Sequence, residues 1–126
     1  MGETIVQRIK KSIKADTVIP KPEAKANFIV KGWGIRRGEE ALIYLIPNHN
    51  NPHKPYPKGI NVSEWEKAYD QITSKNEFSR QWFNQNMPAC ANEGGCNFTT
   101  IGGIFELLGI AEYERGVYRF RHTHRI

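Results

Sequence analysis

Residues 98–121 read FTTIGGIFELLGIAEYERGVYRFR, and this stretch combines the pattern of a helix with that of two strands. In its first part, apolar side chains recur every three or four positions, which predicts a helix with one buried face from about Phe98 to Leu108. Gly109 follows, at a position where helices commonly end in a left-handed conformation. The sequence therefore predicts a helix that leads directly into the next element.

The second part of this stretch, residues 110–121, predicts a tight β-hairpin. If Arg115-Gly116 forms a two-residue turn, one face of the hairpin is apolar and the other places Glu112 opposite Arg119. A three-residue turn would mix apolar and charged side chains on both faces, so we expect the shorter turn. The expected cross-strand pairs are Ala111 with Phe120, Glu112 with Arg119, Tyr113 with Tyr118 and Glu114 with Val117.

Two further helices are expected before this stretch. Ser63 and Glu66 have the spacing of a capping box, which predicts that the first of them begins there. The second is expected to begin at Ser79 and to end before Pro88, since proline interrupts a helix. Apolar residues flank the Ser79 cap with the spacing of a hydrophobic staple, and these are Phe78 and Phe83.

Three helices followed by a hairpin are the order of the winged helix-turn-helix family, which residues 62–121 resemble. Within this range, Leu108-Gly109-Ile110 looks like the exit from the third helix into the first wing strand, and Arg115-Gly116 looks like a wing tip. The resemblance implies a winged-helix-like half whose third helix enters a DNA major groove, while the wing contacts phosphates or the minor groove. It assigns DNA contacts to Thr99, Thr100 and Gly103 on the helix and to Arg115, Arg119 and Arg121 on the wing.

The third helix also departs from this family's pattern. It has no Arg, Lys, Asn or Gln after Asn97, and it carries Glu106. The missing side chains are those that usually read bases directly. Residues 62–126 hold 7 basic and 8 acidic side chains, which does not favour phosphate binding. Since many winged helices contact proteins instead, a protein-contact role stays open.

The positive charge of the chain is concentrated in its first half. Residues 1–61 hold 11 basic and 5 acidic side chains, so we expect any attraction to nucleic acid to depend on this half. A basic amphipathic helix is expected up to about Lys14, with Arg8 and Lys11 available to phosphates. The ordinary alternatives are that the charge only aids solubility and that the helix packs on the domain, and we expect no membrane binding.

Residues 28–46 predict a second hairpin, with its turn at Arg37-Gly38. Its second strand is apolar on both faces, which indicates a central position in a sheet. Residues 47–59 contain four prolines, and we expect no regular helix or strand there. Loops of this length are often functional. We expect a single domain made of three parts, which are the basic helix and linker of residues 1–22, the hairpin and proline-rich loop of residues 28–61, and the C-terminal half of residues 62–126.

A contact surface for a second copy of the chain, another protein or a ligand is the main alternative to nucleic-acid binding. The residues expected on it are Trp33, His49, His53 and Gly102. The adjacent Gly102 and Gly103 are costly inside a helix, which indicates close approach of another group. Either a partner or ligand fills this space, or another element of the same core does, such as the 28–46 hairpin.

No group of residues singles out catalytic chemistry or a cofactor. Cys90 and Cys96, five residues apart on an expected loop, could join His122 and His124 at a zinc ion, stay reduced or form a disulfide. His49 and His53 could serve a metal-dependent hydrolase, but no carboxylate lies near them in the sequence. Two cysteines and no signal-peptide pattern lead us to expect a cytoplasmic protein.

The composition is consistent with one folded domain. The chain has 126 residues, of which 39% are hydrophobic and 25% charged. This length supports a single core. We therefore expect a small single α+β domain with an N-terminal helix, a hairpin, three helices and a winged-helix-like hairpin. Its expected function is non-enzymatic nucleic-acid binding or regulation, and the alternative is a homo-oligomeric protein- or ligand-interaction module.

Overall fold

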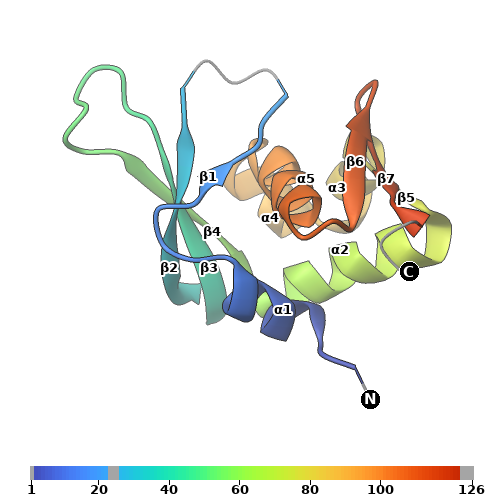
Figure 1. The fold of residues 1–126 in the computed structure, drawn as a ribbon. Helices are drawn as coiled ribbons and strands as arrows, with labels where there is room; N and C mark the ends of the chain where they lie inside the picture. The colour runs from blue at the N-terminus through green and yellow to red at the C-terminus, as the bar shows by residue number, and fades with distance from the viewer. Residues whose placement is uncertain (1, 23–25, 123–126) are drawn as a thin grey trace.

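Two antiparallel sheets with helices between and beside them make up the fold, in a computed structural model that describes residues 2–22 and 26–122 (Figure 1). The first sheet has the order β1-β2-β3-β4, from Val18–Ile19, Phe28–Arg36, Glu39–Ile46 and Tyr56–Asn61. The second has the order β5-β7-β6, from Glu77–Ser79, Val117–Phe120 and Ala111–Glu114. The helices are α1 (Ile5–Ser12), α2 (Val62–Lys75), α3 (Arg80–Asn86), α4 (Pro88–Glu93) and α5 (Asn97–Leu107). The described residues therefore form the expected small α+β domain.

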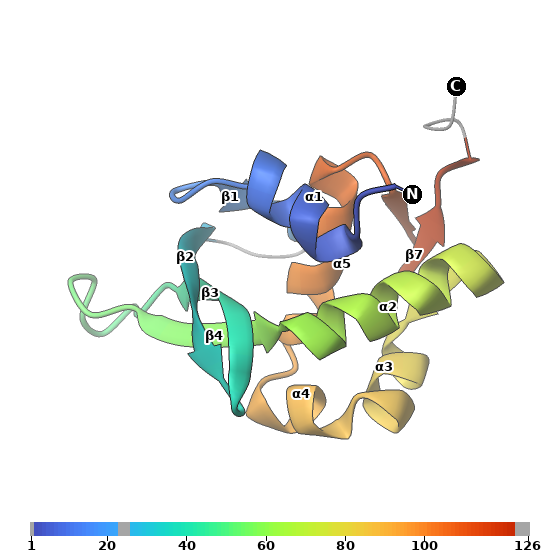
Figure 2. The same ribbon diagram turned by 90° about the horizontal axis from the view of Figure 1, so that it is seen from below.

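The helix α5 occupies the centre of the molecule, between the two sheets (Figure 1). Eight of its residues are buried, on all sides of the helix. Figure 2 shows that α2 runs from the end of β4 to the second sheet, so that it links the two ends of the molecule. A continuous set of buried apolar side chains extends from α1 and the first sheet through α5 to β7. The two halves thus share one core.

The first hairpin forms as predicted. Arg37 and Gly38 both have positive φ, of 50° and 79°, as a two-residue hairpin turn requires. The strand β3 lies between β2 and β4, and this confirms the central position indicated by its apolar residues. The register shifts between Val30 and Gly32, where a bulge interrupts the pairing of β2 with β3.

The prediction that residues 47–59 contain no strand was wrong. Residues 56–61 form β4 and pair with β3, and Pro57 lies opposite Leu45. The strand tolerates Pro57 because β4 lies at the edge of the sheet and has a strand on one side only. A proline, which has no N–H to donate, is accepted at such an edge. The proline-rich loop is therefore shorter than expected and covers residues 47–55.

One of the predicted helix starts was wrong. The capping box of α2 uses Asn61 and Glu64, two residues before the predicted pair. The end of the next helix before Pro88 is confirmed, because α3 ends at Asn86, but Pro88 also begins the short helix α4, which was not predicted, at a position where proline needs no N–H. The cap of α3 at Ser79 is confirmed, and the ring centroids of its staple residues, Phe78 and Phe83, lie 6.2 Å apart.

The predicted register of the second hairpin is confirmed. Ala111 pairs with Phe120, Glu112 with Arg119, Tyr113 with Tyr118 and Glu114 with Val117. The turn residues Arg115 and Gly116 have positive φ, and Gly109 at the end of α5 has a φ of 75°. The expected ion pair of Arg119 with Glu112 does not form. Instead, Nε of Arg119 lies 3.0 Å from Oε1 of Glu114, and its Nη1 lies 3.5 Å from Oε1 of Glu77. Glu77 belongs to β5, a third strand that pairs with β7.

The paired glycines of α5 pack inside the domain. A methyl group on Gly102 would overlap the ring of Tyr118, and one on Gly103 would overlap the carbonyl oxygen of Pro20. Both positions are buried. The close approach that the sequence indicated is therefore made by the second hairpin and by the segment after β1, and the 28–46 hairpin is not the neighbour. Gly102 presents no surface to a partner in this structure.

Candidate functional site

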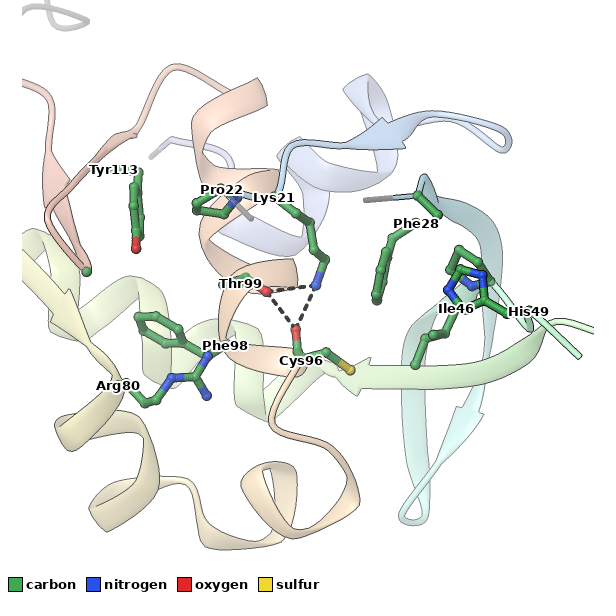
Figure 3. Close-up of a pocket in the computed structure, with 13 residues that line it drawn as sticks. Lys21, Pro22, Phe28, Ile46, His49, Arg80, Cys96, Phe98, Thr99 and Tyr113 are labelled. Atoms are coloured by element: carbon green, nitrogen blue, oxygen red, sulfur yellow. Dashed lines mark hydrogen bonds between the residues drawn. The ribbon is translucent and has the colours of Figure 1, made fainter. Parts of the chain in front are cut away.

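A cavity of about 560 Å³ lies between the two halves of the domain, beside the first turn of α5 (Figure 3). One wall comes from the first sheet and the loop after β3, through Phe28, Ile46 and His49. The opposite wall comes from the C-terminal half, through Phe98 and Tyr113. This volume is in the range of small-molecule binding sites, and both walls are largely aromatic or aliphatic.

Lys21 lines this cavity. Its ammonium group donates hydrogen bonds to the carbonyl oxygen of Cys96 at 2.8 Å and to the hydroxyls of Thr99 at 2.8 Å and Thr100 at 2.7 Å. The same nitrogen lies 4.3 Å from the centroid of the Phe28 ring. All three ammonium hydrogens are thus directed at uncharged oxygens at the start of α5.

Within the described part of the chain, no carboxylate neutralises Lys21. Burial lowers the pKa of Lys21 to about 8, the interaction with Cys96 opposes this shift, and the positive charge of Arg80 adds to it. The group is still mainly protonated at neutral pH. The N-terminal end of a helix carries a partial positive charge. Lys21 adds its own charge beside this end of α5, so the two contributions together make the cavity electropositive.

Arg80 provides a second positive charge. It is the first residue of α3, and its guanidinium lies 4.7 Å from the centroid of the Phe98 ring. Its Nη1 donates a hydrogen bond to the carbonyl oxygen of Gly95 at 3.0 Å. No acidic side chain pairs with Arg80 among the described residues. The cavity therefore holds two cations from opposite halves of the chain, and its described lining includes no Asp or Glu.

A buried hydrogen-bonded chain lies next to Cys96, which lines the cavity. The hydroxyl of Tyr44 donates to Oδ1 of Asn97, and Nδ2 of Asn97 donates to the carbonyl oxygen of Cys90 at 2.9 Å. Burial, followed by the interaction with Cys96, raises the pKa of Tyr44 far above its ordinary value, so the hydroxyl stays protonated. The Sγ atom of Cys96 lies 3.1 Å from the same hydroxyl and lines the cavity.

The expected loop position of the two cysteines is wrong for Cys90, which belongs to α4, whereas Cys96 lies on the short turn between α4 and α5. Cys90 is buried in α4, Cys96 directly precedes α5, and both thiols are free. Burial raises the pKa of Cys90 well above its ordinary value. His124 of the suggested zinc set lies outside the described residues. In the part of the chain that is described, no three His, Cys, Asp or Glu side chains gather as a metal site.

The residues that the winged-helix resemblance assigned to DNA on α5 face the interior. Thr99 and Thr100 accept hydrogen bonds from Lys21, and Thr100 and Gly103 are buried. The first sheet and the segment after β1 cover this side of the helix. The start of α5 thus faces Lys21 and the cavity, which Thr99 helps to line.

The basic residues assigned to nucleic acid are spread over two elements. Arg8 and Lys11 lie on α1, whereas Arg115, Arg119 and Arg121 lie on or beside the β6–β7 hairpin. Arg8 interacts with the carbonyl of Leu108, Lys11 with Glu3, and Arg119 with Glu77 and Glu114. Arg115 and Arg121 are exposed, and the backbone N–H of Arg121 donates a hydrogen bond to the carbonyl oxygen of Ile110 at 2.7 Å.

Of the residues expected on a contact surface, only His49 lines the cavity. His53 is exposed on the 47–55 loop, and Trp33 is half-buried with the Lys10 ammonium 4.9 Å from its ring centroid. No predicted site residue corresponds to either cation of the cavity, Lys21 or Arg80. The Pro20-Lys21-Pro22 sequence is a signal that could have pointed to Lys21, since prolines on both sides restrict its backbone.

Comparison of the chain with protein-family models, with curated proteins and with solved structures finds no match. Among the residues that the structure describes, every helix is too short or too polar to pass through a lipid bilayer. The function must therefore be argued from the cavity and the charges around it.

Proposed function

We propose that the protein is a non-enzymatic ligand-binding module that holds an organic anion in the cavity between its two halves. The observation that carries this proposal is that two cations, Lys21 and Arg80, line a cavity whose described lining has no carboxylate. A buried charge is costly unless an opposite charge or hydrogen bonds compensate for it. Lys21 has the hydrogen bonds, but none of the described residues gives it an opposite charge, which an anionic ligand would supply.

The size and walls of the cavity favour an organic anion over a simple ion. A volume of about 560 Å³ is far larger than an inorganic phosphate or sulfate needs. Ile46, Pro47 and Tyr113 offer apolar and aromatic surface to a ligand body of the same character. Binding is favoured over covalent catalysis because the three Lys21 hydrogens are all donated to oxygens, and this holds the group as an ammonium.

Calorimetric titration with a panel of organic anions and neutral analogues of the same shape tests this proposal. We expect at least one anion to bind, its neutral analogue to bind at least tenfold more weakly, and Arg80→Gln to weaken binding by about tenfold. Lys67→Gln is the matched control, because Lys67 is exposed on α2 away from the cavity. If no member of the panel binds, or if both variants weaken binding equally, the proposal fails.

Nucleic-acid binding is a second candidate, and the order of the elements in the C-terminal half favours it. The succession α2, β5, α3, α5, β6 and β7, with sheet order β5-β7-β6, supports a winged-helix-like architecture interrupted by α4. Because α5 is buried, we propose that contact with DNA would use the exposed Arg115 at the hairpin tip. Fluorescence anisotropy with duplex DNA at low salt tests this. Salt-sensitive binding that Arg115→Gln weakens supports it, and no binding removes it.

Self-association also stays a prediction. Light scattering at several protein concentrations tests it, because a dimer gives a mass that rises with concentration and a strict monomer does not.

A further inference from the structure

The two cations in the cavity have different roles available to them. All three Lys21 hydrogens are donated to protein oxygens, so Lys21 contributes a positive charge and no further hydrogen bond. Arg80 has an acceptor only for its Nη1 among the described residues, and its remaining N–H groups are available. A guanidinium matches the oxygens of a phosphate or carboxylate in pairs. The anionic group of a ligand therefore belongs against Arg80, with Lys21 beside it.

The charge at this position favours a doubly charged group over a single carboxylate. Lys21 and Arg80 together supply two positive charges, and no Asp or Glu appears in the described lining. Both cations lie at the N-terminal end of α5, whose dipole adds positive potential. A phosphomonoester carries a charge between −1.5 and −2 at about pH 7, whereas a carboxylate carries −1. The phosphomonoester is the closer match.

The available aromatic surface is on Tyr113. The ring of Phe28 stacks with Tyr44 at 6.3 Å and also has the Lys21 ammonium near it, so its faces are already used. The ring of Tyr113 makes an edge contact with Tyr118 at 5.0 Å and lines the cavity on the same side as Arg80 (Figure 3). A flat ring system could stack there, as nucleobases do on exposed aromatic side chains.

We infer that the ligand is a phosphomonoester joined to a flat aromatic ring, that is, a nucleoside monophosphate group, with its phosphate against Arg80 and its ring on Tyr113. This inference rests on the proposed function and specifies its ligand class. The same group occurs in a free mononucleotide and at the 5′-phosphorylated end of a nucleic-acid strand. Both sources present the same chemistry to the cavity.

Calorimetric titration of the full chain tests the inference with AMP, adenosine, benzoate, and a short oligonucleotide with and without a 5′-phosphate. We expect AMP to bind at least tenfold more tightly than adenosine and benzoate. If the source is a strand end, the 5′-phosphorylated oligonucleotide binds more tightly than both AMP and its dephosphorylated form. If the source is a free nucleotide, AMP binds more tightly than either oligonucleotide. Benzoate binding without AMP binding overturns the inference but leaves the proposed function intact.

Variants assign the two contacts separately. Arg80→Gln should weaken AMP binding by about tenfold and reduce the preference for AMP over adenosine, while Lys67→Gln leaves both unchanged. Tyr113→Leu should weaken AMP and adenosine alike, and Tyr113→Phe should retain binding because the ring is kept. Thermal unfolding of each variant identifies any that fail to fold. Unchanged AMP affinity in folded Arg80→Gln overturns the placement of the phosphate, and with it the inference.

Discussion

Lys21 and Arg37 both connect the two halves of the domain, yet their partners differ in charge. Arg37, in the turn between β2 and β3, donates hydrogen bonds to the carboxylates of Glu64 and Glu93 and to the carbonyl oxygen of Gly59. Among the described residues, Lys21 donates only to uncharged oxygens. Two acidic side chains therefore neutralise Arg37, whereas no described acidic side chain neutralises Lys21 in its cavity.

The pKa values of the two groups shift in opposite directions as a result. Burial acts to lower the pKa of Arg37, but its hydrogen bonds to Glu64 and Glu93 raise it above the ordinary value. Burial lowers the pKa of Lys21 to about 8, with no carboxylate to oppose it in the described part of the chain. Arg37 therefore stabilises the fold, whereas the charge on Lys21 costs stability that a bound anion would restore.

The largest effect is expected from breaking the neutralised contact. Arg37→Met removes four hydrogen bonds and the cation that Glu64 and Glu93 share, although Glu93 still has Arg36 at 3.6 Å. We expect the free energy of unfolding, measured with urea at neutral pH, to fall by about 3 kcal/mol. A loss below about 1 kcal/mol would mean that Arg37 does not hold the halves together.

A smaller, pH-dependent effect is expected from removing Lys21. Between about pH 8 and pH 10.5 the unfolded chain keeps the proton on Lys21 while the folded chain loses it, so the free energy of unfolding rises with pH. This pKa shift corresponds to at most about 3 kcal/mol, which partial exposure reduces to about 2 kcal/mol. Lys21→Met abolishes this rise.

The comparison of wild type with Lys21→Met isolates this group, because other side chains titrate in the same pH range. Tyr44, Tyr118 and Cys90 all have pKa values raised first of all by burial, so they lower the stability of both proteins at high pH. Urea unfolding at several pH values should show wild type gaining on the variant above pH 8. A difference that stays constant across this range would show that Lys21 is not a costly buried cation.

The smallest effect is expected at the second Arg-Gly turn. Arg115 and Arg37 occupy the same position in turns of the same conformation, with φ of 51° and 50°. Arg115 is exposed and has no acidic partner among the described residues, so Arg115→Gln should change the free energy of unfolding by less than about 0.5 kcal/mol. A loss close to that of Arg37→Met would show that the turn itself, and not the ion pairs, stabilises the domain.

The features that the sequence predicted correctly are those fixed by neighbouring residues. Both Arg-Gly turns, the Ser79 cap and the register of the second hairpin depend on a few consecutive side chains. The strand β4 was missed because the tolerance of Pro57 depends on its place at a sheet edge, which is a property of the whole sheet.

The cavity could not be predicted because its parts come from distant segments. Lys21 and Thr100 are 79 residues apart in the chain, and Arg80 belongs to a third element. Nothing in the local sequence brings these groups together, and the linker with Lys21 has no helical or strand pattern. The burial of α5 was missed for the same reason, since the first sheet that covers it precedes it by many residues.

The pKa of the Lys21 ammonium group, measured by NMR titration with ¹³C-labelled lysine, tests the central claim most directly. The Lys21 signal, assigned by its loss in Lys21→Met, should titrate near pH 8 in the free protein and at a higher pH when AMP is present in excess. Titration of Lys21 at the ordinary pKa of a lysine side chain, about 10.4, without response to AMP, would contradict the account.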